Sequence, residues 1–392
     1  MRILLLSFYY PPDIGPGPLR AKSIVDALFA FGGQEVEINV LTTLPNRYQT
    51  LEVTAPREEQ YGPVSITRIP LPEHKGKMVD QSCAFVHYAR AVQQRVRGKQ
   101  WDVVVATSSR LMTASLGALI AKRCRARLYL DLRDLFTDTM EGVLAKSLLR
   151  ALLPGIRVLE RRTFRAACQI NVVSAGFLSY VQSVVPGITS TAYTHGIDPT
   201  FVETDFMQST ISAKPVVLYA GNIGDGQGLH RIVPETAAAM PGVQFRIVGD
   251  GGQRDLLIES VDRLALTNVE VLNPVVRNVL LEAYRQADVL FLHLNTFTAF
   301  NKVLPSKIFE YAATGKPVLA GVGGYAADFL RNEVPGVEVF APCDGDAMKA
   351  CLEILLSGPS IIDRSEFCSL YLRENIMHQM AGDILALSGA KG

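Results

Sequence analysis

The sequence contains no apolar stretch long enough to cross a membrane, which takes about 20 consecutive apolar residues. Residues 1–8 have the apolar character of a signal peptide, but Pro11, Pro12 and Asp13 end that stretch early. We therefore interpret residues 2–10 as a buried strand and expect a cytoplasmic protein without a membrane-spanning helix.

Paired cysteines and clustered metal ligands are also missing. The six cysteines show no Cys-x-x-Cys spacing and lie in apolar segments, so we expect reduced thiols and no zinc site. The aspartates are scattered, and no Asp-x-Asp motif ends a predicted strand. The sequence therefore predicts no metal and no cofactor. Any phosphate charge then has to be met by helix ends, backbone amides and lysines.

Net charge is close to zero but unevenly distributed. The 392 residues carry a formal net charge of +1. Residues 1–195 hold 24 basic and 15 acidic residues, a net of +9, and the remainder holds 15 and 23, a net of −8. A basic half of this kind predicts an anionic partner, which could be a membrane surface, a lipid phosphate or a nucleic acid.

What is present is an alternation of apolar strand-length runs with helical segments, which predicts an α/β protein built on parallel sheets. The length and the 48% hydrophobic content allow two domains with separate cores. The alternation is interrupted by a polar stretch and then restarts. We therefore predict a first domain at 1–198, a linker at 199–214, a second domain at 215–365 and a helical segment at 366–392.

Glycine-rich turns open both predicted domains. Gly15 and Gly17 follow the first strand, Gly221 opens the loop after the strand at 216–220, and Gly249 begins a third turn. A strand, a glycine loop and a helix in succession bring backbone N–H groups close to a phosphate. For the first loop the alternative is a simple tight turn, since it lacks a Gly-x-Gly-x-x-Gly pattern. Two such loops, one in each half, favour two similar domains that face each other.

Residues 304–317 have the pattern of one short helix, with Pro305 suited to its first position. A helix N-terminus offers free N–H groups to a phosphate, and Lys302 and Lys307 flank this end. Glu310 lies one turn further along, where its carboxylate can accept two hydrogen bonds from a ribose diol. The alternative interpretation is a buried connecting helix with a surface glutamate.

Polar and basic residues also mark the first half. Arg133 and Asp134 follow the strand at 126–131. Parallel sheets bind ligands at the carboxyl ends of their strands, so these two residues are predicted to contact a ligand. The alternative is a mutual ion pair that holds the loop. Residues 144–167 form a basic amphipathic stretch that predicts contact with anionic lipid, or else an ordinary solvated face. The polar residues 46–61 are a candidate acceptor-side loop.

The sequence PSKIFEYAATGKP at residues 305–317 resembles the donor-site helix of retaining glycosyltransferases of family 4. These have the GT-B fold, in which two Rossmann-like domains face each other across a cleft. The branch that builds bacterial surface polysaccharides is the most similar, and the resemblance covers most of the chain. It implies that Glu310 holds the nucleotide ribose and that Lys302 replaces a second glutamate that faces the donor sugar. It also implies that the helical segment at 366–392 returns to the first domain.

The same resemblance assigns the other site residues. Arg133 and Asp134 match the place near the acceptor and the transferred sugar, and the backbone of Val275 matches the segment that reads the base. Gln227 stands near the place of a lysine that neutralises the diphosphate. The remaining donor-site residues are Gly15, Gly17, Gly221, Asn222, Gly249, Asp250, Leu304, Pro305, Ser306 and Lys307.

The function that this resemblance implies is a retaining, metal-independent transfer from a UDP-sugar, with a HexNAc or deoxy-HexNAc as the sugar. The expected acceptor is a saccharide on a lipid diphosphate in O-antigen or capsule-type synthesis, reached at the inner face of the plasma membrane. No nucleic acid partner is expected. The alternatives are an epimerase or hydrolase of similar fold, which would need carboxylates or histidines placed for acid–base chemistry, and a catalytically silent nucleotide-binding scaffold.

Overall fold

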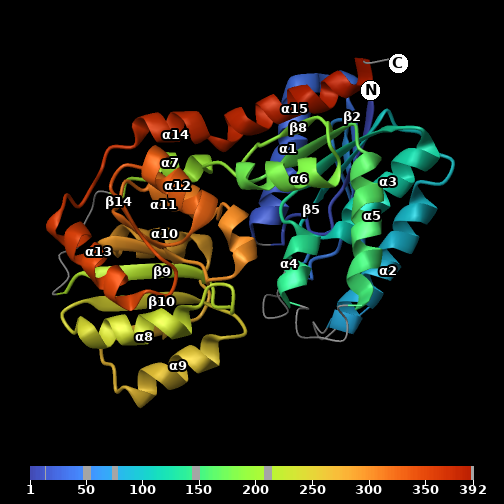
Figure 1. Cartoon of the computed structure of the whole chain (residues 1–392). Helices are drawn as coiled ribbons and strands as arrows, with labels where there is room; N and C mark the ends of the chain where they lie inside the picture. Colours follow the sequence, from blue (N-terminus) through green and yellow to red (C-terminus); the bar gives the residue numbers. More distant parts are fainter. Residues whose placement is uncertain (14, 47–53, 73–77, 144–150, 207–213, 390–392) are drawn as a thin grey trace. The chain divides into compact units, whose positions relative to one another are not determined.

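The computed structural model describes residues 1–13, 15–46, 54–72, 78–143, 151–206 and 214–389. The chain divides into two compact units (Figure 1). The first consists of Met1–His195 together with Arg373–Gly392, and the second is the continuous segment Gly196–Leu372. Both units are α/β structures built on parallel sheets, so the predicted fold class is confirmed.

The first unit is built on an eight-stranded sheet in the order β3-β4-β2-β1-β5-β6-β7-β8. Its neighbouring strands pair in parallel except β3, which is antiparallel to β4. The central strands are almost fully buried, as expected for parallel strands covered on both faces. The strands are β1 (Arg2–Leu6), β2 (Glu37–Thr43), β3 (Glu58–Tyr61), β4 (Val64–Ile69), β5 (Val103–Ser108), β6 (Arg127–Leu132), β7 (Gln169–Val172) and β8 (Ser190–Thr191).

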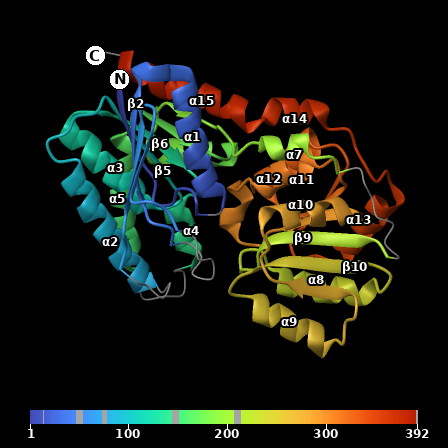
Figure 2. The ribbon, with the colours of Figure 1, turned by 180° about the vertical axis from the view of Figure 1, so that it is seen from behind.

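Helices cover both faces of this sheet. Helix α1 packs against α15, which also contacts β5 and β6, whereas α3 lies over the same two strands with α2 and α5 beside it (Figures 1 and 2). The last helix of the chain therefore completes the first unit. The helices are α1 (Pro16–Gly32), α2 (Met78–Arg95), α3 (Leu111–Cys124), α4 (Phe136–Val143), α5 (Leu153–Arg165), α6 (Leu178–Val184) and α15 (Arg373–Gly389).

The second unit has a six-stranded, all-parallel sheet in the order β11-β10-β9-β12-β13-β14. Successive side chains of β9 and β12 enter two different hydrophobic clusters, one on each face of the sheet, because strand side chains alternate. The strands are β9 (Val216–Asn222), β10 (Gln244–Asp250), β11 (Val269–Leu272), β12 (Val289–His293), β13 (Val318–Gly321) and β14 (Val337–Phe340).

The helices of the second unit surround this sheet. One cluster includes residues of α7, α10, α11, α12 and α14, and the other includes residues of α8, α9 and α13. The helices are α7 (Pro199–Glu203), α8 (Leu229–Ala239), α9 (Arg254–Arg263), α10 (Arg277–Gln286), α11 (Lys307–Ala313), α12 (Gly324–Glu333), α13 (Gly345–Ser357) and α14 (Ser365–Tyr371).

Three sequence predictions differ from the structure. The expected linker at 199–214 begins with helix α7, and Phe201 and Phe206 are 5% and 3% exposed in the core of the second unit; residues 207–213 lie outside the described part. The expected returning segment at 366–392 is two helices, and α14 stays with the second unit. The expected loop at 46–61 contains β3, whose alternation is too short and too polar to recognise.

Two further observations concern the general predictions. No helix in the described ranges is both long and apolar enough to cross a bilayer. All six cysteines lie within those ranges and are free thiols.

Candidate functional site

Two glycine turns of the second unit, residues 221–228 after β9 and 249–252 after β10, pack backbone against backbone. The amide of Ile223 donates to the carbonyl oxygen of Asp250 at 2.8 Å. A Cβ at Gly249 would lie 1.8 Å from a carbonyl oxygen of the first turn. The close approach of the two backbone segments therefore requires glycine. It places the predicted residues Gly221, Asn222, Gly249 and Asp250 together at the carboxyl ends of β9 and β10.

The first of these turns is closed by its own side chains. The side-chain amides of Asn222 and Gln227 hydrogen-bond one another at 2.7 Å. The amide of Gly224 donates to Oε1 of Gln227 at 3.2 Å, and the hydroxyl of Tyr219 donates to the carbonyl of Asn222 at 2.6 Å. The polar end of Gln227 is thus engaged inside the turn.

His293, the last residue of β12, links the same turn to the segment that follows β14. Its Nε2 accepts the amide of Cys343 at 2.9 Å, and its Nδ1 lies 2.6 Å from the carbonyl oxygen of Gln227. Because Nε2 accepts, the ring proton is on Nδ1, which donates to Gln227. The ring is 1% exposed, and burial lowers the pKa of His293 to about 4, so the imidazole is neutral at pH 7.

Asn295 supports the turn from the loop after β12. Its Nδ2 donates to the carbonyl of Asp225 at 2.8 Å, and its backbone amide donates to the carbonyl of Gly226, also at 2.8 Å. Neither Asn295 nor His293 was predicted from the sequence. The only signal for either was a polar residue at the end of an apolar strand.

Helix α11 begins at Lys307, two residues later than predicted from Pro305. The amides of Ile308 and Phe309 donate to the carbonyls of Pro305 and Ser306, at 3.1 and 3.2 Å, and form a tightened turn ahead of the helix. The difference has a consequence for phosphate binding. Two of the amides that a helix N-terminus would offer are already engaged in this turn.

The carboxylate of Glu310 is held on one side only. Its Oε2 accepts from Nζ of Lys307 at 2.9 Å and from the hydroxyl of Tyr284 at 3.4 Å, and Lys307 also donates to that hydroxyl at 3.0 Å. Among the described residues, none donates a hydrogen bond to Oε1. Burial lowers the pKa of Lys307, but the charge of Glu310 outweighs it and holds this pKa well above its ordinary value.

Lys307 was predicted to meet phosphate, and in the structure its partner is Glu310. The side chains of the pair are 29% and 24% exposed, so the pair is accessible from solvent. Tyr284 comes from α10, and no local sequence signal connects it to α11. Lys307 and Glu310 of this cluster were therefore predicted from the sequence, whereas Tyr284 was not.

The remaining predicted donor-site residues differ in exposure. Leu304 is 2% exposed in the hydrophobic core, so its side chain is structural and only its backbone is available to a ligand. Val275 is exposed in the segment before α10. Lys302 ends a short 3₁₀ turn at Thr298–Lys302, which packs closely on Gly324 at the start of α12.

In the first unit, the glycine loop and Arg133 come together although they are far apart in the sequence. Gly15 precedes α1, and Gly17 lies in its first turn. A Cβ at Gly17 would lie 1.7 Å from Nη1 of Arg133, so the guanidinium rests directly on this glycine. The structure thus joins two segments that the sequence analysis assigned separately.

Asp134 has partners of its own. Its Oδ1 accepts from the hydroxyl of Thr139 in α4 at 3.3 Å. Burial raises the pKa of Asp134, although hydrogen bonds from the Leu135 amide and from Thr139 lower it. Arg133 therefore lies on Gly17 and Asp134 contacts α4, while the positive charge of Arg133 also lowers the pKa of Asp134.

Beneath these residues lies a buried ion pair. Nε and Nη2 of Arg20 donate to the two carboxylate oxygens of Asp131, each at 2.8 Å. Thr107 and Asn171 donate to the same carboxylate at 2.6 and 2.8 Å. Burial raises the pKa of Asp131, but Arg20 and these donors outweigh it, so the pKa is lowered. The pair joins α1 to β5, β6 and β7, and the sequence analysis missed it.

The same arginine supports the chain just before the boundary between the units. It donates to the carbonyls of Tyr193 and Thr194 at 2.9 and 2.7 Å. The next residue, His195, has a pKa well below its ordinary value because of burial and the charges of Arg20 and Arg133. His195 is therefore a neutral, structurally placed histidine close to Arg133.

No group of three or more histidine, cysteine, aspartate or glutamate side chains could hold a metal ion within the ranges that the structure describes. The charged groups of the candidate site include Arg133, which lies on Gly17, in the first unit and the Lys307–Glu310 pair in the second.

Both units match known families. The first matches the glycosyl transferase 4-like domain over residues 21–187, and the second matches the glycosyl transferases group 1 over residues 202–368. The chain therefore belongs to the glycosyltransferases of the GT-B fold.

Individual relatives agree with this classification. WcaI of Escherichia coli (strain K12), whose name assigns it to colanic acid biosynthesis as a glycosyl transferase, is 28% identical over 177 residues. The match covers 44% of this chain and 43% of WcaI, so it spans less than half of that relative. Among solved structures, WaaG, a glycosyltransferase involved in lipopolysaccharide biosynthesis, has a TM-score of 0.64 at 16% identity, with 99% of this chain and 97% of WaaG covered. HepE of Anabaena, solved with UDP and glucose, has a TM-score of 0.61 at 15% identity, with 99% and 97% covered.

Proposed function

We propose that this protein transfers a sugar from a nucleotide diphosphate sugar to a saccharide acceptor in the synthesis of a bacterial surface polysaccharide. The observation that carries the proposal is the half-satisfied carboxylate of Glu310. Lys307 and Tyr284 hold one oxygen, and the other oxygen keeps its capacity to accept hydrogen bonds. A ribose diol supplies two hydroxyl donors, which suits such a carboxylate.

The donor that we propose is a UDP-sugar carrying a HexNAc or deoxy-HexNAc. The likeness to HepE, solved with UDP and glucose, supports the choice of nucleotide. The amides of the turns at 221–228 and 249–252 that do not already donate within the second unit would bind the diphosphate, since turns of this kind form anion-binding concavities. On this account the transfer needs no metal ion, retains the anomeric configuration, and uses the leaving phosphate to accept the acceptor proton.

For the acceptor we propose a saccharide on a lipid diphosphate at the inner face of the plasma membrane. The names of WcaI and WaaG support a polysaccharide or lipopolysaccharide pathway. Helix α5 supports membrane contact, because it combines exposed arginines with the exposed apolar residue Val158, and the exposed Leu152 directly precedes it. These arginines are Arg157, Arg161, Arg162 and Arg165. Residues 144–150, the first part of the predicted basic stretch, lie outside the described residues.

The decisive experiment incubates the purified protein with UDP-sugars and a lipid diphosphate sugar, with and without EDTA. Sugar transfer that survives EDTA is the expected result. Turnover with water alone, or epimerisation of the donor, would replace the proposal with a hydrolase or epimerase. Nucleotide binding without any turnover would identify a silent scaffold. A strict need for magnesium or manganese would overturn the metal-independent route.

The residue test is Glu310→Gln, with Glu282→Gln on the surface of α10 as the matched control. Glu310→Gln should weaken UDP binding by about 10- to 100-fold, since hydrogen bonds to a charged group contribute about 1.5–3 kcal/mol. It should change stability by less than about 1 kcal/mol because the pair is partly exposed. Calorimetric UDP titration measures the first and thermal unfolding the second. Equal UDP binding by the two variants would reject the ribose assignment.

A further inference from the structure

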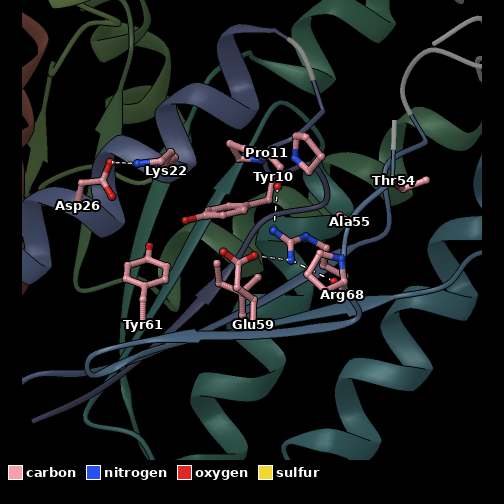
Figure 3. Close-up of a pocket in the computed structure, with 12 residues that line it drawn as sticks. Tyr10, Pro11, Lys22, Asp26, Thr54, Ala55, Glu59, Tyr61 and Arg68 are labelled. Atoms are coloured by element: carbon pink, nitrogen blue, oxygen red, sulfur yellow. Dashed lines mark hydrogen bonds and ion pairs between the residues drawn. The ribbon is translucent and has the colours of Figure 1, made fainter. Parts of the chain in front are cut away.

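The first unit contains a pocket of about 480 Å³ between α1 and the hairpin formed by β3 and β4 (Figure 3). Its four charged residues form two ion pairs. Lys22 pairs with Asp26 on α1, and Arg68 pairs with Glu59 across the hairpin at 2.8 Å. These charges satisfy one another, so the pocket offers no free charge to a ligand. Unused hydrogen-bond donors are found in the second unit, in the turn at 221–228.

Two neighbouring backbone amides of this turn are unused. Of the six amides from Ile223 to Gly228, four donate within the second unit. The other two, those of Asp225 and Gly226, have no acceptor among the described residues. Asp225 is exposed and Gly226 is partly exposed, so a ligand can reach this part of the turn.

The carbonyls of the same residues are all held by the loop after β12. Asn295 donates from Nδ2 to the carbonyl of Asp225 and from its backbone amide to that of Gly226, each at 2.8 Å. Nδ1 of His293 donates to the carbonyl of Gln227 at 2.6 Å. In a trans peptide the C=O and the N–H point in opposite directions. The amide of Gly226 shares a peptide with the carbonyl of Asp225, so it points away from Asn295.

The amide of Asp225 is directed in a similar way. It shares a peptide with the carbonyl of Gly224, which accepts the amides of Gln227 and Gly228 at 3.1 and 3.3 Å. Because that carbonyl points into the turn, the amide of Asp225 points out of it. Adjacent outward amides of this kind form a concavity that binds phosphate oxygens.

The support behind the turn is rigid and buried. Asn295 is 2% exposed, and its Oδ1 accepts the amide of Thr296 at 2.8 Å and Nη1 of Arg231 at 3.4 Å. His293 is 1% exposed and also accepts the amide of Cys343. The two amides are thus fixed before a ligand arrives, and little freedom is lost on binding. Helix α8, which starts directly after the turn, adds the positive end of its dipole.

We propose that Asn295 and His293 are positioning residues for the donor, which hold the amides of Asp225 and Gly226 toward its diphosphate. The inference rests on the proposed function, because that function supplies the diphosphate. Neither positioning residue contacts the ligand, and each acts through a carbonyl of the turn. Their effect should therefore be seen with UDP and be absent with uridine, the same nucleoside without phosphate.

The first test compares Asn295→Ala with Asn268→Ala. Asn268 is a matched control, since it is 4% exposed in the same unit and its Nδ2 also donates to backbone carbonyls, far from the turn in sequence. These are the carbonyls of Ala237, Met240 and Val243, at 3.0, 3.1 and 2.9 Å. Asn295→Ala should weaken UDP binding by about tenfold and leave uridine binding unchanged. Asn268→Ala should lower the unfolding temperature to a similar extent but bind UDP as the wild type does.

UDP is titrated by calorimetry and uridine by ligand-observed NMR, with thermal unfolding as the measure of stability. A purely structural role for Asn295 predicts that its variant behaves like Asn268→Ala. The ratio of UDP to uridine affinity separates the two roles, because damage to the whole unit would lower both affinities.

A second pair of variants tests the amide directly and decides the matter if Asn295→Ala does not fold. The amide of Gln227 donates to the carbonyl of Gly224, which makes Asp225 the second residue of a four-residue turn. Proline suits that position, and Asp225 is not among the described residues with positive φ. Asp225→Pro removes an N–H that has no acceptor, so it should not lower stability. It should bind UDP about tenfold more weakly than Asp225→Ala, which lacks the same carboxylate but keeps the amide.

Equal UDP affinity of Asp225→Pro and Asp225→Ala would overturn the inference, and so would equal UDP affinity of Asn295→Ala and Asn268→Ala. A parallel loss of UDP and uridine affinity in Asn295→Ala would also overturn it. A wild-type protein that binds no UDP would reject both the inference and the proposed donor. UDP binding that depends on Asn295, without sugar transfer to any acceptor, would reject the proposed function and support the positioning role.

Discussion

The Arg20–Asp131 ion pair of the first unit and the Lys307–Glu310 ion pair of the second unit differ in burial. The side chains of Arg20 and Asp131 in the first unit are 2% and 0% exposed, and further donors complete the shell of the carboxylate. Those of Lys307 and Glu310 in the second unit are 29% and 24% exposed, and only one oxygen of the carboxylate is held.

Burial and the number of hydrogen bonds to the carboxylate distinguish a structural ion pair from one that can bind a ligand. A buried, fully satisfied pair has no capacity left for a ligand, and removal of one partner leaves an uncompensated charge. A part-exposed, half-satisfied pair contributes little to stability and keeps acceptor capacity. We therefore assign Arg20 and Asp131 to the scaffold, and this contrast supports the proposal that Glu310 binds a ligand.

The largest expected effect is that of Asp131→Ala, which should destabilise the first unit by about 3–5 kcal/mol because Arg20 remains buried without its partner. The single tryptophan, Trp101, is 5% exposed in this unit, so its fluorescence during urea unfolding reports the change. Lys307→Met in the other pair should cost less than about 1 kcal/mol. Similar losses of unfolding free energy for the two substitutions would contradict the distinction between a structural pair and a ligand-binding pair.

A smaller effect should appear on acidification, through His293 in the second unit. The unfolded chain binds a proton near pH 6.5, whereas folded His293 does so only near about 4. The unfolding free energy should therefore fall as the pH drops through this window, by about 3 kcal/mol in total. The lowered pKa of Asp131 also stabilises the folded protein. This contribution to the unfolding free energy is lost at lower pH, because it declines only below about pH 3.8.

Hydrogen exchange of peptides from β12 and the turn at 221–228 would measure this pH dependence. His293→Gln should flatten the profile of the second unit. His195→Gln is the matched control, because His195 is a neutral histidine of the first unit and should leave the second profile unchanged. An equal pH slope in wild type and His293→Gln would contradict the assignment.

An effect on stability smaller than those expected for Asp131 and His293 separates the two glycine regions. Gly249→Ala should destabilise by about 1–3 kcal/mol, because the added Cβ meets backbone that cannot move aside. Gly17→Ala should cost less, since the flexible side chain of Arg133 can shift, but it should lower transfer activity by displacing that guanidinium. Chemical unfolding and transfer assays together measure both. Greater destabilisation by Gly17→Ala would show that Arg133 is a structural residue.

The comparison also shows where prediction from sequence succeeded. The strands predicted at 126–131 and 216–220 correspond within two residues to β6 (Arg127–Leu132) and β9 (Val216–Asn222), because each is an apolar run followed by turn residues. The start of α11 was wrong because a tightened turn at 305–309 resembles a helical turn in its spacing. Strand β3 was missed because its residues are mostly exposed, and pairing with β4 holds it in place.

The sequence by itself determined the alternation of strands and helices and the division into two α/β halves, and it predicted residues 304–317 as a site segment. These features are encoded within a few neighbouring residues, as the length and period of apolar runs. Only the tertiary structure decided that Arg133 lies on Gly17, that Tyr284 joins Glu310 and that Arg20 pairs with Asp131. Such contacts depend on the order of strands in each sheet and on close packing between distant segments, which local periodicity does not encode.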